Sequence, residues 1–82
     1  MSKQIDEIRK KYGEPMLRMG IDHVIGVGIN NLKDVNADEV CARILKETPA
    51  NSIMTPEFSA ELMRCAIELS QISIGDILKY IQ

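Results

Sequence analysis

The chain has 82 residues, of which 45% are hydrophobic and 27% charged, and its formal net charge is −2. This length favours one small domain, 1–82, with a core only just large enough to hold it, and the apolar content excludes disorder. The longest run without a polar side chain is residues 24–29, whereas a membrane helix needs about 20 residues, so no bilayer span is expected.

Two further aspects of the composition concern location and cofactors. No apolar stretch follows the N-terminal charges, as a secretory signal would require. Cys41 and Cys65 fall on apolar helix faces, which indicates buried free thiols rather than a disulfide. Two distant cysteines and one histidine are too few for structural zinc. We therefore expect a cytoplasmic protein with no metal, no other cofactor and no membrane contact.

The N-terminal segment is predicted to be helical. Residues 2–12 carry one narrow apolar stripe at i, i+3 and i+7, formed by Ile5, Ile8 and Tyr12. Gly13 suits the left-handed conformation that ends a helix. Pro15 suits the first position of a short helical turn over residues 15–19.

Residues 21–29 fit either a strand or a helix. In a strand, four aliphatic residues share one face, and Gly26 and Gly28 share the other. In a helix, Gly20, Gly26 and Gly28 would each cost about 1 kcal/mol. The strand is therefore favoured. It needs a partner, either residues 52–54 or the same strand of a second copy.

Three more helices are expected in the second half of the chain. Asn36 is a suitable cap for a helix over residues 36–46, and Thr55 followed by proline for one over residues 56–70. After a tight turn, a short last helix covers residues 73–81, with one apolar stripe formed by Ile74, Ile77, Leu78 and Ile81. The predicted fold is mainly α: a small four-helix domain with one short β-strand at residues 21–29 and a C-terminal helical hairpin.

The helix over residues 56–70 has apolar residues on too much of its surface for one neighbour. Ala60, Met63 and Ile67 lie almost opposite Phe58, so the non-polar arc spans about 220° of the helix, whereas a surface helix needs about 100° or somewhat more. This helix must be buried on two sides. Its second face packs either against the first half of the chain or against a partner.

Residues 66–81 also resemble a DNA-binding helix-turn-helix. Two short helices and a tight turn fit the motif, but Gln71 stands where glycine is usual and Ser70 where an apolar residue is expected. The second helix offers only Asp76 and Lys79 to the bases. A purely structural pair of helices explains the same pattern better.

Two local features invite a chemical interpretation. The glycines at 26 and 28 lack the third glycine and the adjacent helix of a dinucleotide fingerprint. His23 would need an orienting group and a reacting partner, and Asp22 points to the other face of a strand. An enzyme is therefore the less favoured class, with His23 as the residue that a small enzyme subunit would use.

The basic residues form one small cluster. Arg9, Lys10 and Lys11 lie together near the N-terminus, close to compensating carboxylates, and Lys79 lies in the last helix. A solvated helix face is the preferred interpretation. If the protein bound nucleic acid, these four side chains would contact it.

The favoured function is a small, non-enzymatic interaction or regulatory protein that acts through an apolar helical surface. It would be a homodimer or a subunit of a complex. Two observations motivate this hypothesis: the unpaired strand beside flexible methionines, and the two-sided helix. The residues expected at the partner are Met16, Met19, Ile25, Val27, Ala60, Met63 and Ile67.

Overall fold

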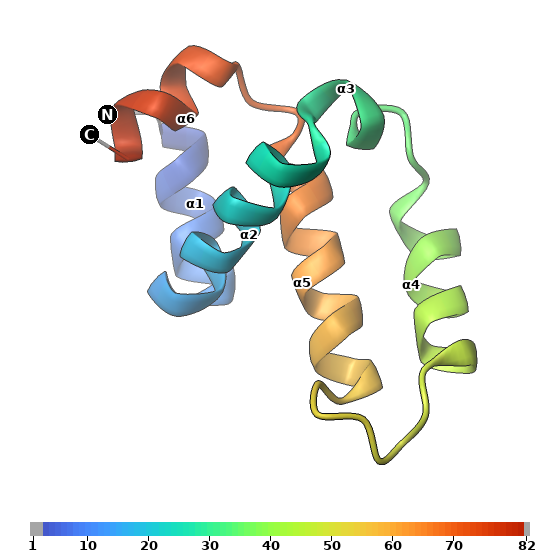
Figure 1. Ribbon diagram of the computed structural model, residues 1–82. Coiled ribbons are helices and arrows are strands. Elements are labelled where there is room, and N and C mark those ends of the chain that lie inside the picture. Colours follow the sequence, from blue (N-terminus) through green and yellow to red (C-terminus); the bar gives the residue numbers. More distant parts are fainter. Residues whose placement is uncertain (1–2, 82) are drawn as a thin grey trace.

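The computed structural model describes residues 3–81, which form six helices and no strand (Figure 1). The mainly α class predicted from the sequence is confirmed. In chain order the helices are α1 (Lys3–Tyr12), α2 (Glu14–Val27), α3 (Ile29–Leu32), α4 (Ala37–Glu47), α5 (Pro56–Leu69) and α6 (Ile74–Ile81). The expected helical turn over residues 15–19 is the first part of α2.

The prediction of a strand at residues 21–29 is wrong, because most of this segment is the second half of α2. The destabilisation of a helix by the glycines was overestimated. Gly28 lies outside the helix at φ +100°, where its N–H bonds to the Val24 carbonyl at 2.8 Å and ends α2. Gly20 is within the helix but allows close contact with α5: an added Cβ would lie 2.9 Å from the Cys65 sulfur. Among the three glycines, only Gly26 destabilises the helix without allowing a close contact, since nothing lies within 4 Å of a Cβ added there.

Burial on α2 follows helical spacing and not alternation. Ile21 and Val24 are 3% and 0% exposed, whereas Ile25 is 52% exposed. A strand would have placed Ile21 and Val24, which are both buried and three residues apart, on opposite sides. The proposed strand partner, residues 52–54, lies instead in the loop between α4 and α5.

The starts of α4 and α5 follow the predicted caps. The Asn36 side chain accepts a hydrogen bond from the Glu39 N–H at 3.1 Å, and Thr55 Oγ1 accepts one from the Phe58 N–H at 3.1 Å. Each cap satisfies a backbone donor that the first helical turn leaves unpaired. The helix boundaries in this half of the chain are therefore determined by local sequence.

Helix α5 has a neighbour on each side, as its broad apolar arc requires. It packs against α2 on one side and against α4 on the other. Cys65 and Leu69, both fully buried, face the α2 side at Gly20. On the α4 side, the Ala60 carbonyl accepts a hydrogen bond from Cys41 Sγ at 3.3 Å. The second face of this helix thus packs within the chain.

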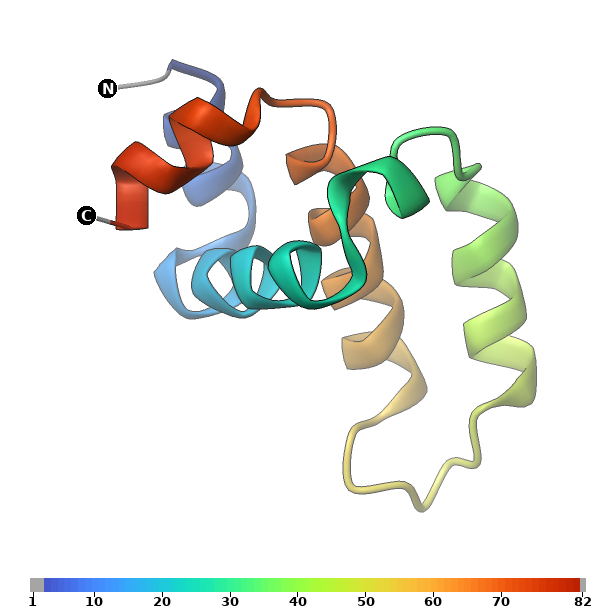
Figure 2. The same ribbon diagram turned by 45° about the horizontal axis from the view of Figure 1, so that its top comes forward.

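Two regions can be distinguished in Figures 1 and 2. The body consists of α1, α2, α6 and the C-terminal half of α5. The arm consists of α4, the loop over residues 48–55 and the N-terminal half of α5, and it projects away from the body with the loop at its end. The principal dimensions of 38 × 24 × 19 Å reflect this elongated shape.

The C-terminal pair of helices is present, but α6 does not pack along α5. A turn over residues 70–73 leads the chain away, and α6 lies beside α1 (Figures 1 and 2) and reaches α2 through the hydrogen bond from Tyr80 to Glu14. The single apolar stripe predicted for this helix is also split. Ile77 is fully buried, whereas the remaining three aliphatic residues of the stripe are about half exposed: Ile74, Leu78 and Ile81.

Candidate functional site

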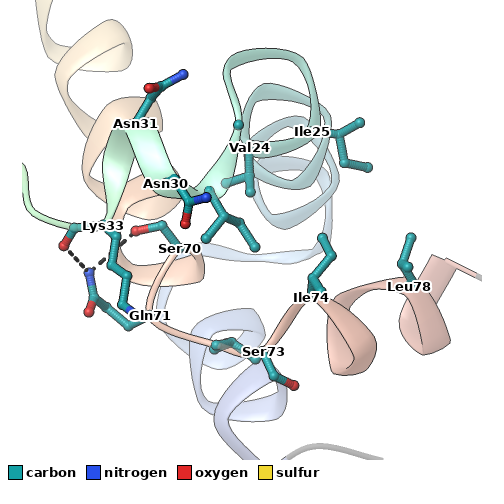
Figure 3. Close-up of a pocket in the computed structure, with 13 residues that line it drawn as sticks. Val24, Ile25, Asn30, Asn31, Lys33, Ser70, Gln71, Ser73, Ile74 and Leu78 are labelled. Carbon is teal, nitrogen blue, oxygen red and sulfur yellow. Dashed lines mark hydrogen bonds between the residues drawn. The ribbon is translucent and has the colours of Figure 1, made fainter.

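An open groove between α2 and α6 has a volume of about 980 Å³. Its lining comes from the end of α2, the residues from Gly28 to Lys33 around α3, the turn after α5, and α6 itself (Figure 3). The first two segments adjoin in the sequence, whereas the turn and α6 lie far from them. The groove therefore depends on how α3 and α6 are held.

The first determinant of the groove is the tight break between α2 and α3. The positive φ of Gly28 changes the chain direction, so that α3 leaves α2 at its C-terminal end. On the opposite wall, Gln71 Nε2 donates to the Lys33 carbonyl oxygen at 2.8 Å and to Ser70 Oγ at 3.3 Å. This contact joins the end of α3 to the turn after α5, as Figure 3 shows.

The second determinant is the attachment of α6 to the body through its side chains. Ile77 is fully buried in the core. The Tyr80 hydroxyl donates to a Glu14 carboxylate oxygen at 2.6 Å, and the Arg9 guanidinium lies 5.1 Å from the centre of the Tyr80 ring. The Tyr80 hydrogen bond, together with the charges of Arg9 and Arg18, lowers the pKa of Glu14.

The groove has an apolar floor and an apolar rim. Val24 and Ile72 on the floor are 0% and 4% exposed. On the rim, Ile25, Ile74 and Leu78 are 52%, 50% and 47% exposed. Rim side chains that are half exposed can lose much more water contact when a second apolar surface covers them. The groove can therefore bind an apolar ligand surface.

The lining also contains polar side chains. They include the amides of Asn30 and Asn31 and the hydroxyl of Ser73, and Lys33 is the ionisable side chain among the described lining residues. A few polar groups beside an apolar floor are typical of binding sites.

The seven residues predicted to contact a partner are not brought together. Three of them are core residues: Met16, Ala60 and Ile67 are 7%, 7% and 5% exposed. Met63 is partly buried against the core. Met19, Ile25 and Val27 are exposed on α2, and of the seven residues only Ile25 lines the groove.

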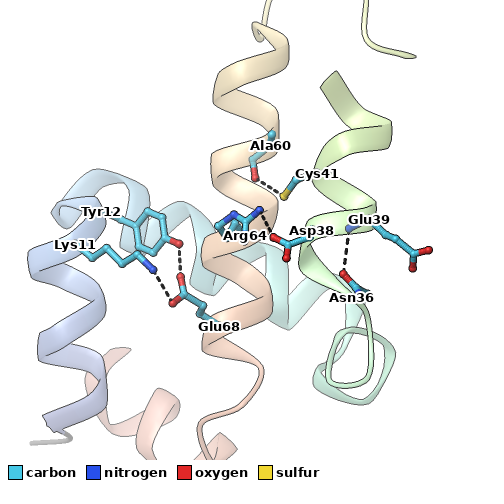
Figure 4. A network of polar contacts seen from close by, with 9 residues as sticks. All are labelled: Lys11, Tyr12, Asn36, Asp38, Glu39, Cys41, Ala60, Arg64 and Glu68. Carbon is cyan, nitrogen blue, oxygen red and sulfur yellow. Dashed lines mark hydrogen bonds and ion pairs between the residues drawn. The ribbon is translucent and has the colours of Figure 1, made fainter. Parts of the chain in front are cut away.

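Two of the basic residues proposed for nucleic acid are engaged by carboxylates. Arg9 forms ion pairs with Asp6 and Glu14 at 3.1 and 3.0 Å. Lys11 Nζ lies 3.0 Å from Glu68, which also accepts a hydrogen bond from the Tyr12 hydroxyl (Figure 4). The contacts of Glu68 with Lys11 and Tyr12 tie α1 to α5. Lys10 and Lys79 are exposed, on α1 and α6 respectively.

The histidine and the cysteines form no reactive cluster within the described part of the chain. His23 is partly buried on α2, and no hydrogen bond among residues 3–81 involves its side chain. Cys41 and Cys65 are buried free thiols. Burial raises the pKa of the Cys65 thiol to about 11, so it is uncharged at neutral pH.

Within residues 3–81, no group of three or more potential ligand side chains is placed to hold a metal ion. None of the helices in this range combines the length and the apolar character needed to cross a bilayer.

Most of the groove was missed by sequence reasoning. The overlooked residues are those of the turn and of α6, above all Ile74 and Leu78. The sequence pattern was misleading here, because one stripe at i, i+3, i+4 and i+7 predicts a helix that buries all four of its aliphatic side chains against one neighbour. In the structure only Ile77 of this stripe is buried.

Comparisons of the chain with protein-family models, with curated proteins and with solved structures found no match.

Proposed function

We propose that this chain is a non-enzymatic interaction protein, regulatory or a subunit of an assembly, which binds a partner at the groove between α2 and α6. One observation carries the proposal. Ile25, Ile74 and Leu78 stand about half exposed around an apolar floor, where a covering surface would remove them from water. Grooves of this kind bind apolar protein segments in many complexes.

The physical state of the groove fits reversible association. Its floor is preformed, because Val24 and Ile72 are already packed in the core. A partner would therefore not have to order the backbone of the binding site, which lowers the cost of binding. The buried free thiols support action in the cytoplasm, where cysteines stay reduced.

The helix-turn-helix alternative receives less support from α6. A recognition helix has to present polar side chains to base edges. The outward residues of α6 are mainly aliphatic, with Lys79 as the exposed basic group on this helix. We therefore do not propose DNA binding.

The proposal can be tested by affinity capture from the native lysate with the unchanged chain and with Leu78→Glu. The substitution puts a charge on the rim, and we expect it to remove the proteins captured through the groove. Met19→Glu is the control, because Met19 is 38% exposed on α2 but does not line the groove. Recovery of the same proteins by all three chains, together with unchanged self-association, would contradict the proposal.

A further inference from the structure

The loop at the end of the arm carries two adjacent exposed apolar residues. Ile53 is fully exposed, and the neighbouring Met54 is 39% exposed. We call these two residues the apolar tip. Single exposed aliphatic residues are common on protein surfaces, but here two adjacent ones belong to the loop over residues 48–55, which ends the projecting arm (Figures 1 and 2).

The apolar tip and the groove lie at opposite ends of the same helix. α5 begins at Pro56, just after the tip, and ends at Leu69, just before the turn that lines the groove. Its 14 residues separate the two by about 20 Å, at 1.5 Å per residue. The tip of one molecule therefore cannot reach the groove of that molecule.

The tip and the groove are both apolar. One is a pair of adjacent exposed apolar side chains on a loop, and the other is a concave apolar surface with Ile74 and Leu78 on its rim. The charges closest to them are of opposite sign. Lys33 lines the groove, whereas Glu57, the ionisable residue nearest to the tip in the sequence, is exposed.

We infer that the occupant of the groove is the apolar tip of a second copy of this chain. This inference rests on the proposed binding function of the groove and specifies its partner. The contact joins two different surfaces, head to tail, so a dimer keeps one free tip and one free groove. Repetition of the contact produces short chains of molecules or a closed ring.

The size of the tip sets the expected strength of the contact. Two side chains and a loop bury less than the roughly 1,200 Å² of a small specific interface, so each contact is weak and forms at high protein concentration. The net charge of −2 offers little electrostatic resistance to self-association.

The test measures the mass of the full chain by sedimentation equilibrium from micromolar to millimolar concentration. The unchanged chain is expected to rise in mass past the dimer. Ile53→Glu removes the tip and Leu78→Glu blocks the groove, so each variant alone stays monomeric. Mixed in equal amounts, they form dimers and nothing larger, because only the tip of one and the groove of the other are intact. Met19→Glu associates like the unchanged chain.

Several outcomes would overturn the inference. These are a monomeric mass for the unchanged chain at all concentrations, a mixture that stays monomeric, or association that Leu78→Glu abolishes and Ile53→Glu does not affect. The last result would indicate a symmetric contact through α6. A monomeric chain that still captures a partner in a Leu78-dependent manner would leave the proposed function intact and remove only the second copy as occupant. If Leu78→Glu loses helical circular dichroism, Ile74→Glu takes its place as the groove variant.

Discussion

The body and the arm bury their apolar residues to very different extents. In the body, Leu17, Leu69 and Ile77 are completely buried. In the arm, α4 packs mainly on α5, and Leu45 stays 49% exposed. The difference shows that one short chain can form a well-packed core and still leave aliphatic side chains outside it. In this molecule several of those side chains lie at the groove and in the loop of the arm, and others lie elsewhere on α2, α4 and α6.

The polar contacts repeat this contrast. Glu14 links three elements of the body through Arg9, Arg18 and Tyr80, within a small space. The ion pair between α4 and α5 joins Arg64 to Asp38 at 2.9 Å, and the Asp38 side chain is 89% exposed. An exposed pair of this kind adds little to stability. The arm therefore relies on its helix caps and on the contact between its two helices.

The largest expected effect is a difference in stability between a body leucine and an arm leucine. Leu17→Ala removes a side chain that is 0% exposed and leaves a cavity, which should lower the free energy of unfolding by about 2–5 kcal/mol. Leu45→Ala removes a side chain that is 49% exposed on the side of α4 that faces α5, and should lower it by about 1 kcal/mol. Urea denaturation followed by circular dichroism gives both values. Equal losses would mean that the arm is as tightly packed as the body.

A smaller effect on stability, opposite in sign at the two positions, is expected when Gly20 and Gly26 of α2 are each replaced by alanine. At Gly20 a new Cβ would lie 2.9 Å from Cys65 Sγ and 3.0 Å from Leu69 Cδ1. Overpacking of this kind costs about 1–3 kcal/mol, which exceeds the helix preference of alanine. At Gly26 nothing lies within 4 Å of the new Cβ, so Gly26→Ala should stabilise the helix by up to about 1 kcal/mol.

Thermal denaturation of the two variants measures this sign difference directly. The unfolding temperature should fall for Gly20→Ala and rise for Gly26→Ala. A rise for both would show that α2 and α5 are not in close contact at Gly20. The position of α2 relative to α5 would then have to be revised.

The smallest expected effect concerns the pH dependence of α6. The folded state lowers the pKa of Glu14 from its ordinary value of 4.5, because the carboxylate accepts the Tyr80 hydroxyl and lies near Arg9 and Arg18. A lowered pKa stabilises the folded state above the ordinary value, and this stabilisation is lost as the pH falls through the folded value. Acid should therefore loosen α6, at the groove, before the rest of the body.

The Tyr80 ring resonances in NMR spectra provide the measurement. They should shift toward those of a mobile tyrosine as the pH falls below the ordinary glutamate value. Glu14→Gln should show little of this acid-dependent change, whereas Glu7→Gln, at an exposed position of α1, should retain it. Tyr80 signals that stay constant from neutral to acid pH would contradict the proposed role of Glu14.

Local sequence signals predicted the elements that depend on local contacts. Asn36 and Thr55 each cap the helix that follows, because the capping hydrogen bond reaches only three residues ahead. The error at residues 21–29 arose where a tertiary contact outweighs propensity. The cost of Gly20 depends on Cys65, 45 positions later, and no local pattern shows that contact.

The groove could not be predicted for the same reason. Its shape depends on Gln71 meeting the Lys33 carbonyl and on Tyr80 meeting Glu14, residues that are 38 and 66 positions apart. The sequence did indicate that α5 is buried on two sides. It did not show that exposed aliphatic side chains remain on α6 and on the loop of the arm.

A dilution series followed by methyl NMR tests most directly whether the tip of one molecule occupies the groove of another. The methyl resonances of Ile53 at the tip and of Ile74 and Leu78 at the groove should shift together as the concentration rises. Those of Leu17 in the core and of Leu45 on the arm should stay constant. Resonances of Ile53 that do not move while those of Leu78 do, or the absence of any shift at both sites, would contradict the account.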